Sequence, residues 1–213
     1  MNQYDEIFEM LLAAVQKQEK KPAQEDLNIP VGVSNHHVHL SQRDLDALFG
    51  AGYELTRMKD LSQPGQYACK ETVTVCGPKG VLEKIRILGP VRKETQVEIF
   101  AGDCFKLGVK APVRLSGDLD GTPGVTLVGP KGSVQLEKGA MIAQRHIHMS
   151  PADGERFGVQ DGQTVDLEVS GPRGGVLRNT VIRITNTSAL ECHVDTEEAN
   201  ALGMSNGSSV RIV

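Results

Sequence analysis

From Val31 onward, apolar and polar residues alternate in short runs that are interrupted by turn signals. Alternation with a period of two is typical of β-strands that are buried on one face. Three ranges, 73–90, 124–136 and 165–184, carry a Gly-Pro-basic-Gly sequence between two strand-like stretches. Because glycine and proline favour tight turns, each range is predicted to form a β-hairpin.

A few segments show helix signals instead. Residues 41–50, 150–158 and 195–203 each open on Ser or Asp as an N-cap and close on Gly as a C-cap. Residues 1–20 place apolar side chains at helical spacing, and the polar stretch that follows them contains prolines and is typical of a linker. This N-terminal helix is either a separate docking element or a terminal helix that packs on its own domain.

Composition supports the β-rich interpretation. The 213 residues include 23 Gly and 10 Pro but only 4% aromatic residues, which favours short strands joined by tight turns over a helical bundle. The net charge of -4 predicts no binding to nucleic acid or to an anionic membrane surface. Four cysteines without CxxC spacing are expected to be reduced thiols. We find no membrane-spanning run and no basic signal segment, so we expect a cytoplasmic protein.

The chain also repeats itself. The sequence HVHLSQRDLDALFG, which begins at His37, is matched by HIHMSPADGERFG from His146, and VEIFAGDCFKLG is matched by CHVDTEEANALG. The first copy carries about 15 additional residues before its hairpin. We therefore predict a mainly β fold of pseudo-repeated halves, with two β-barrel domains capped by short α-helices.

Each copy contains two histidines separated by one residue. His37 and His39 form one pair, and His146 and His148 form the other. On a strand, residues i and i+2 face the same side, so each pair directs two imidazoles toward one point. Two imidazoles suit zinc or another divalent first-row metal, although surface or turn histidines have the same spacing.

The repeat supplies a third ligand to each pair. Aligning the copies at Gly108 and Gly203 places Glu98 opposite His193. The predicted ligand sets are His37, His39 and Glu98 in the first copy, and His146, His148 and His193 in the second. Three protein ligands leave one position open, as in catalytic zinc sites, whereas structural zinc is closed by four. We therefore predict two metal ions.

Neighbouring residues are assigned other roles. His36 aligns with Arg145 and is expected at the surface or beside the site, while Cys192 is expected to be a small buried residue. Arg92 follows a Gly-Pro turn six residues before Glu98, so it is predicted to lean toward the metals and to clamp phosphate. The absence of a serine nucleophile elbow, a Walker A loop and a Rossmann fingerprint argues against covalent serine catalysis and ATP binding.

Several segments together resemble a known family. They are VGVSNHHVHLSQ, QPGQYACKETVTVCGPKG, LGPVRKETQVEI, SGDLDGTPGVTLVGPKGSV and RHIHMSPADGERFGV. In this order they resemble the PduL-type phosphate acyltransferases, also called phosphotransacylases, from about residue 29 to residue 213. The family exchanges an acyl group between coenzyme A and phosphate at a pair of zinc ions. The resemblance thus implies acyl-CoA and phosphate as substrates.

The resemblance also implies a domain division and site residues. Residues 28–46 plus 141–213 would form one barrel and residues 47–140 the other, with residues 1–27 as a helix and linker. One zinc would bind the His37, His39 and Glu98 set and meet the sulfur of coenzyme A. The second would bind the three histidines of the other set and face phosphate together with Arg92. The implied coenzyme A contacts are Ser34, Lys59, Arg86, Leu88, His193 and Asn200.

Two positions depart from the family pattern, and other interpretations remain open. His36 stands where an Arg is usual and Lys70 where an acidic residue is common, which puts a substrate contact by residue 36 in question. Members that act inside bacterial microcompartments often begin with a helix like residues 1–20, so this segment is a candidate encapsulation peptide that binds shell or core proteins. A homodimer is expected. The alternatives are a dinuclear zinc thioester hydrolase and a non-enzymatic microcompartment adaptor.

Overall fold

The computed structural model describes residues 27–213, so the predicted N-terminal helix lies outside the described residues. Within this range the chain forms two β-sheets and four short helices. The helices are α2 (Gln42–Phe49), α3 (Ala101–Leu107), α4 (Pro151–Phe157) and α5 (Thr196–Leu202). The prediction of a mainly β fold with helical caps is confirmed.

One sheet closes into a barrel of six strands, in the order β1-β14-β11-β13-β12-β15. Its strands are β1 (Ile29–Ser34), β11 (His146–Met149), β12 (Thr164–Val169), β13 (Gly175–Ile184), β14 (Glu191–Asp195) and β15 (Ser209–Ile212). Alternate residues of these strands fill the barrel with an apolar core that includes Ile147, Leu167 and Ile182. Closure leaves this sheet without a free edge.

The other sheet has nine strands and curls into a half-barrel that does not close. Its order is β7-β10-β6-β2-β5-β4-β8-β9, with β3 paired to β4 outside this order. The strands are β2 (His37–His39), β3 (Arg57–Asp60), β4 (Tyr67–Cys76), β5 (Val81–Gly89), β6 (Gln96–Glu98), β7 (Val113–Arg114), β8 (Thr126–Val128), β9 (Ser133–Gln135) and β10 (Ala140–Ala143). One of the two predicted barrels is therefore an open, curled sheet.

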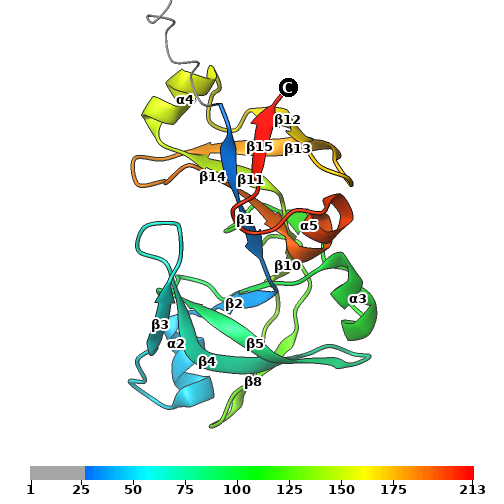
Figure 1. The fold of residues 1–213 in the computed structure, drawn as a ribbon. Helices are drawn as coiled ribbons and strands as arrows, with labels where there is room; N and C mark the ends of the chain where they lie inside the picture. The colour runs from blue at the N-terminus through cyan, green and yellow to red at the C-terminus, as the bar shows by residue number, and fades with distance from the viewer. Residues whose placement is uncertain (1–26) are drawn as a thin grey trace, which may run out of the picture.

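The halves are joined because each donates a strand to the other. β1 comes directly before β2 in the chain but pairs in parallel with β14, and β10 comes before β11 but pairs in parallel with β6. Figure 1 shows the closed barrel above the open sheet, with β1 descending from the barrel toward β2. The predicted domain segment 28–46 is therefore shared between the two sheets. β1 belongs to the closed barrel, whereas β2 pairs with β5 and β6 of the open sheet. The division into two folding domains remains a prediction.

The repeat seen in the sequence is a repeat of structure. β2 and β11 each lie between a parallel partner, β5 or β13, and an antiparallel partner, β6 or β14. A helix follows each of β2, β6, β11 and β14, although β6 and α3 are separated by two residues. The caps of three helices follow the prediction, because the Ser41, Ser150 and Asp195 side chains accept backbone hydrogen bonds and each helix ends at a glycine.

The predicted hairpins also form. The Gly-Pro-basic-Gly sequences connect β4 to β5, β8 to β9 and β12 to β13, and each pair is antiparallel. No helix within residues 27–213 is long and apolar enough to cross a membrane.

Candidate active site between the two halves

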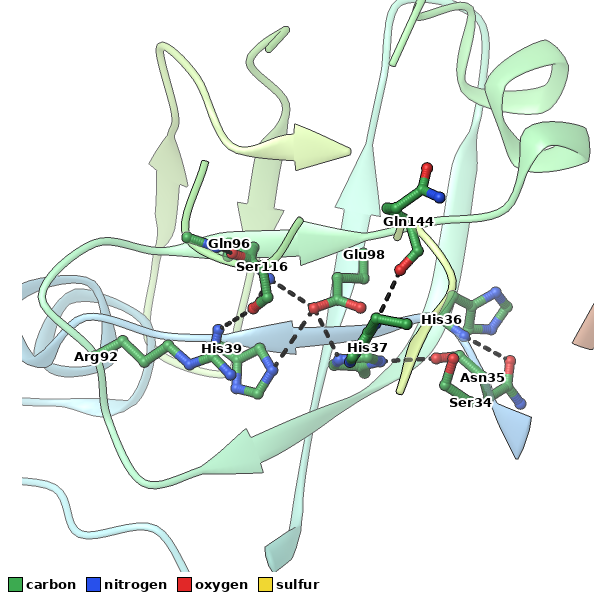
Figure 2. Close-up of polar contacts among 12 residues, drawn as sticks. Ser34, Asn35, His36, His37, His39, Arg92, Gln96, Glu98, Ser116 and Gln144 are labelled. Carbon is green, nitrogen blue, oxygen red and sulfur yellow. Dashed lines mark hydrogen bonds and ion pairs between the residues drawn. The ribbon is translucent and has the colours of Figure 1, made fainter. Parts of the chain in front are cut away.

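The first histidine pair meets a carboxylate across two antiparallel strands. His37 on β2 is directly opposite Glu98 on β6. Nε2 of His37 lies 3.4 Å from Oε1 of Glu98, and Nε2 of His39 lies 3.9 Å from the same oxygen. Figure 2 shows the Glu98 carboxylate aimed at both rings. We call these three residues the first triad.

The second pair meets an imidazole at the equivalent position. His146 on β11 is directly opposite His193 on β14. Nε2 of His146 lies 3.1 Å from Nε2 of His148, and the ring centroids of the three histidines are 4.7 to 5.2 Å apart. These three residues form the second triad. In each triad, one ligand atom from every residue lies within 4.8 Å of the others.

Backbone carbonyls orient one histidine of each triad in the same way. Nδ1 of His37 donates a hydrogen bond to the Asn35 carbonyl at 2.7 Å, and Nδ1 of His146 donates to the Gln144 carbonyl at 2.8 Å. A hydrogen bond at Nδ1 fixes the tautomer and leaves the Nε2 lone pair directed into the triad. Histidines that bind metals are typically supported by such a bond, so this arrangement fits a metal ion.

The two triads differ in their electrostatics. Burial lowers the pKa of His37, but the charge of Glu98 and its contact with the ring outweigh burial and raise the pKa above its usual value. Burial alone would raise the pKa of Glu98, yet His37, His39 and Arg92 together hold it well below its usual range. Burial and the neighbouring His37 hold the pKa of His39 well below its usual value. Glu98 therefore stays ionised and gives the first triad a negatively charged donor.

The second triad has only imidazoles, and the pKa values of His146 and His148 are lowered. Burial and the charge of His193 lower the pKa of His146 to about 4. Burial and the other two imidazoles lower the pKa of His148 to about 3. Both rings are neutral at pH 7, which is the form that binds a metal ion. The donor sets of the two triads, two imidazoles with a carboxylate and three imidazoles, are both found at catalytic zinc sites.

Both triads face one cavity of about 720 Å³ between the two halves. Five of the six residues predicted to contact coenzyme A line it, namely Ser34, Lys59, Arg86, Leu88 and His193. The sixth, Asn200, lies on α5, is exposed and does not line the cavity. A cavity of this size accommodates the reactive part of a large ligand while its remainder stays outside.

Arg92 reaches the cavity from the loop between β5 and β6. Its backbone N–H donates to the Leu40 carbonyl at 2.8 Å, and Nη1 donates to Oγ of Ser116 at 2.8 Å. Burial lowers the pKa of Arg92, and Glu98 and Arg183 act on it in opposite directions. The position agrees with the expectation that this side chain leans toward the metal ligands (Figure 2).

Some residues that line the cavity or contact a triad were not singled out from the sequence: Arg183 and Glu191 line the cavity, whereas Gln96 contacts a triad residue. Arg183 on β13 is directly opposite His148, and Glu191 on β14 contacts His193. Gln96 donates from Nε2 to Oε1 of Glu98 at 2.6 Å. The alternation of β14 and β6 would have placed Glu191 and Gln96 on the ligand face, two residues before each third ligand, but Arg183 required knowledge of the β11–β13 pairing.

His36 and Cys192, which are next to candidate ligands in the sequence, lie in different surroundings. His36 lines the cavity rather than joining a triad, since its Nδ1 lies 3.2 Å from Oδ2 of Asp103 and its ring centroid lies 5.1 Å from that of Phe100. Cys192 is fully buried in the barrel core. Burial raises the pKa of its thiol to about 12, so it is inert at neutral pH.

Comparisons with known proteins place the chain in a family. The family model for phosphate propanoyltransferase matches residues 30–205. A phosphate propanoyltransferase of Rhodobacter capsulatus is 59% identical over 184 residues, covering 86% of both chains. One of Thermotoga maritima is 59% identical over 87% of this chain and 89% of its own. One of Clostridioides difficile is 47% identical over 100% of this chain and 98% of its own.

These matches span nearly all of the described chain, including both triads and Arg92. The chain therefore belongs to the phosphate propanoyltransferase family, and it is a phosphate acyltransferase.

Proposed function

We propose that this protein exchanges a propanoyl or acetyl group between coenzyme A and phosphate with the help of two zinc ions, one at each triad. The observation that carries this proposal is the meeting of two three-ligand triads and two arginines at one cavity. Zinc would supply a Lewis acid for the reacting oxygens and a ligand site for the thiolate sulfur of coenzyme A.

Phosphate would be held by the arginines. Arg92 comes from the first half and Arg183 from the second. The positive charge of Arg183 lowers the pKa values of Arg92, His146 and His148. Two guanidinium groups that face one space repel each other unless an anion lies between them. A planar guanidinium binds phosphate oxygens in a bidentate manner, which also orients the anion for attack on the thioester carbonyl.

Coenzyme A would enter along the first half. Leu88 offers an apolar surface beside the first triad, while Lys59 and Arg86 offer positive charge at the same cavity. Asn200 would meet the part of coenzyme A that lies outside the cavity. This arrangement places the thioester near the first triad and phosphate near the second, and the two reactants become neighbours in one pocket.

The first test is to incubate the purified protein with propanoyl-CoA or acetyl-CoA and to follow thiol release. We expect release only when phosphate is present, formation of acyl phosphate, and loss of activity after chelation that zinc restores. Thiol release without phosphate would indicate a zinc thioester hydrolase. No release with either substrate would contradict an enzymatic role and favour an adaptor.

We also propose that residues 1–27 are an encapsulation peptide and that the chain forms a homodimer. Removal of residues 1–27 is then expected to leave thiol release unchanged and to abolish association with microcompartment shells. Shell association that persists after removal would contradict the peptide's role. Light scattering at several protein concentrations tests the dimer, and a monomer mass at all of them would contradict it.

A further inference from the structure

Residues 61–66, which we call the strap, connect β3 to β4 in the open sheet and contact the closed barrel. The strap closes on itself because the Leu61 N–H donates to the Gln66 carbonyl at 3.0 Å. It belongs to the segment of about 15 residues that the second copy of the repeat lacks. Ser62, Gln63 and Gln66 line the cavity that both triads face.

Gln63 attaches the strap to the barrel side. Its side chain is only 5% exposed. Nε2 donates to the Ala189 carbonyl at 3.0 Å, and Oε1 accepts from the Ala189 N–H at 3.2 Å. The amide thus pairs with the backbone that leads into β14, as a neighbouring strand would.

Glu191 lies where the strap meets the second triad. Its Oε2 accepts hydrogen bonds from Oγ of Ser62 and from Nε2 of His193, the latter at 2.6 Å. The backbone of β1 leaves room for this carboxylate, because a Cβ at Gly32 would lie 2.7 Å from Cδ of Glu191. The carboxylate is therefore held between the strap, β1 and one ligand of the second triad.

The charges around the second triad indicate how the Glu191 carboxylate would affect a bound cation. The second triad contains no carboxylate, and the nearby positive charge of Arg183 disfavours a divalent cation, whereas the first triad has Glu98. The charge of Glu191 acts on His148 in the opposite sense to that of Arg183. A carboxylate near ligating histidines stabilises a bound cation and fixes the rings.

We propose that Glu191 is a positioning residue through which metal binding at the second triad and attachment of the strap stabilise each other. The inference rests on the proposed function, because it requires a metal ion at the second triad. A metal ion held by Nε2 of His193 would replace that hydrogen bond, and the carboxylate would keep its hydrogen bond from Ser62. Coupling of this kind is reciprocal: the strap strengthens metal binding to the same extent that the metal strengthens strap attachment.

Zinc affinity is measured by competition with a chromophoric chelator in full-length His37→Ala protein. This change is expected to abolish zinc binding at the first triad, so the measured affinity is that of the second triad. We expect Glu191→Gln to lower the affinity about 10- to 100-fold, the usual range for a supporting residue. Two other changes are expected to lower the zinc affinity less. Ser62→Ala removes one hydrogen bond to the carboxylate, and Gly32→Ala displaces the carboxylate but keeps its charge. Glu168→Gln, an exposed carboxylate of β12, is the matched control and should have no effect.

Hydrogen exchange supplies a second measurement that does not depend on activity. In the unaltered chain, zinc is expected to slow amide exchange within residues 61–66, and in Glu191→Gln it should not. Two results would overturn the inference and leave the proposed function intact. One is an unchanged zinc affinity in folded Glu191→Gln, and the other is an amide exchange rate of the strap that does not change when zinc binds. Failure of the unaltered protein to bind zinc would overturn both. If Glu191→Gln does not fold, as judged by thermal unfolding, Ser62→Ala and Gly32→Ala decide the outcome.

Discussion

The two halves of the molecule share one framework but differ in charge at equivalent positions. In the first half Glu98 stands opposite His37, and in the second His193 stands opposite His146. The register of β11 with β13 places Arg183 opposite His148, and the same register continued along β2 and β5 gives Leu88. Opposite the second histidine of each pair, the first half thus has an apolar residue and the second half a cation, while Arg86 lies opposite His37 in the first half.

This difference shows how a repeat produces two unlike sites. The strand pairing determines where the candidate ligands lie, and the proposed function assigns the choice of reactant at each triad to single substitutions within that pairing. An apolar neighbour suits a thioester, whereas an arginine suits an anion. The halves are therefore expected to respond differently to equivalent changes.

The largest effect is expected from loss of a ligand in either half. His37→Ala and His146→Ala should each abolish thiol release and lower the zinc content from two ions to one, because a site with two ligands loses its metal. Zinc analysis of both variants, with thermal unfolding as the control for folding, tests this. Normal activity with normal metal content in either variant would contradict the ligand assignment.

Removal of Arg183 should affect phosphate more than acyl-CoA. A hydrogen bond to a charged group contributes about 1.5–3 kcal/mol, so Arg183→Leu is expected to raise the KM for phosphate roughly 10- to 100-fold. The KM for acyl-CoA should change little. Arg178→Leu, an exposed arginine of the same strand, is the matched control, and equal effects on both KM values would contradict the division between halves.

Exchange of the third ligand makes the first triad resemble the second. Glu98→His should retain zinc and part of the activity, whereas Glu98→Gln should weaken zinc binding at the first triad. In metal-free Glu98→Gln protein, the pKa of His37 should fall below its usual value, since burial and Arg92 lower it and only the hydrogen bond to the Asn35 carbonyl would still raise it. A titration of His37 by NMR measures this, and a pKa that stays raised would contradict the role of Glu98.

The smallest effect is a local response of the metal-free protein to pH. His146 and His148 have pKa values of about 4 and 3, below the usual 6.5, so the unfolded state binds more protons below pH 6.5 and stability falls as the pH drops toward 4. The raised pKa of His37 contributes stability below pH 6.5, and the lowered pKa of Glu98 contributes stability above pH 4.5. Both contributions of the first triad are therefore present between pH 4.5 and 6.5.

Amide exchange at pH 7 and pH 5, corrected for intrinsic rates, distinguishes the two halves. Protection of β11 and β14 should fall about several-fold at pH 5. That of β2 and β6 should fall less, because the contributions of His37 and Glu98 oppose the loss caused by the lowered pKa of His39. Equal loss of protection in both halves would contradict the difference between the triads.

Much of the framework was predictable because its causes are local. The hairpin turns, the capped helices and the two histidine pairs follow from residues close together in the chain. Glu98 and His193 were found because aligning the two copies of the repeat places them at equivalent positions. Arg183 and the contact between Ser62 and Glu191 were not found, since the contact joins residues 129 positions apart and the second copy of the repeat lacks the strap.

The sequence by itself determined which residues are candidate ligands and that they lie on strands, because alternation and an internal repeat suffice for both. Only the tertiary structure decided that β1 and β10 exchange between the halves, which brings the two triads to one cavity. It also decided that one sheet closes and the other does not. Pairing between distant strands depends on how whole sheets pack, and this information is not present in any short segment of the chain.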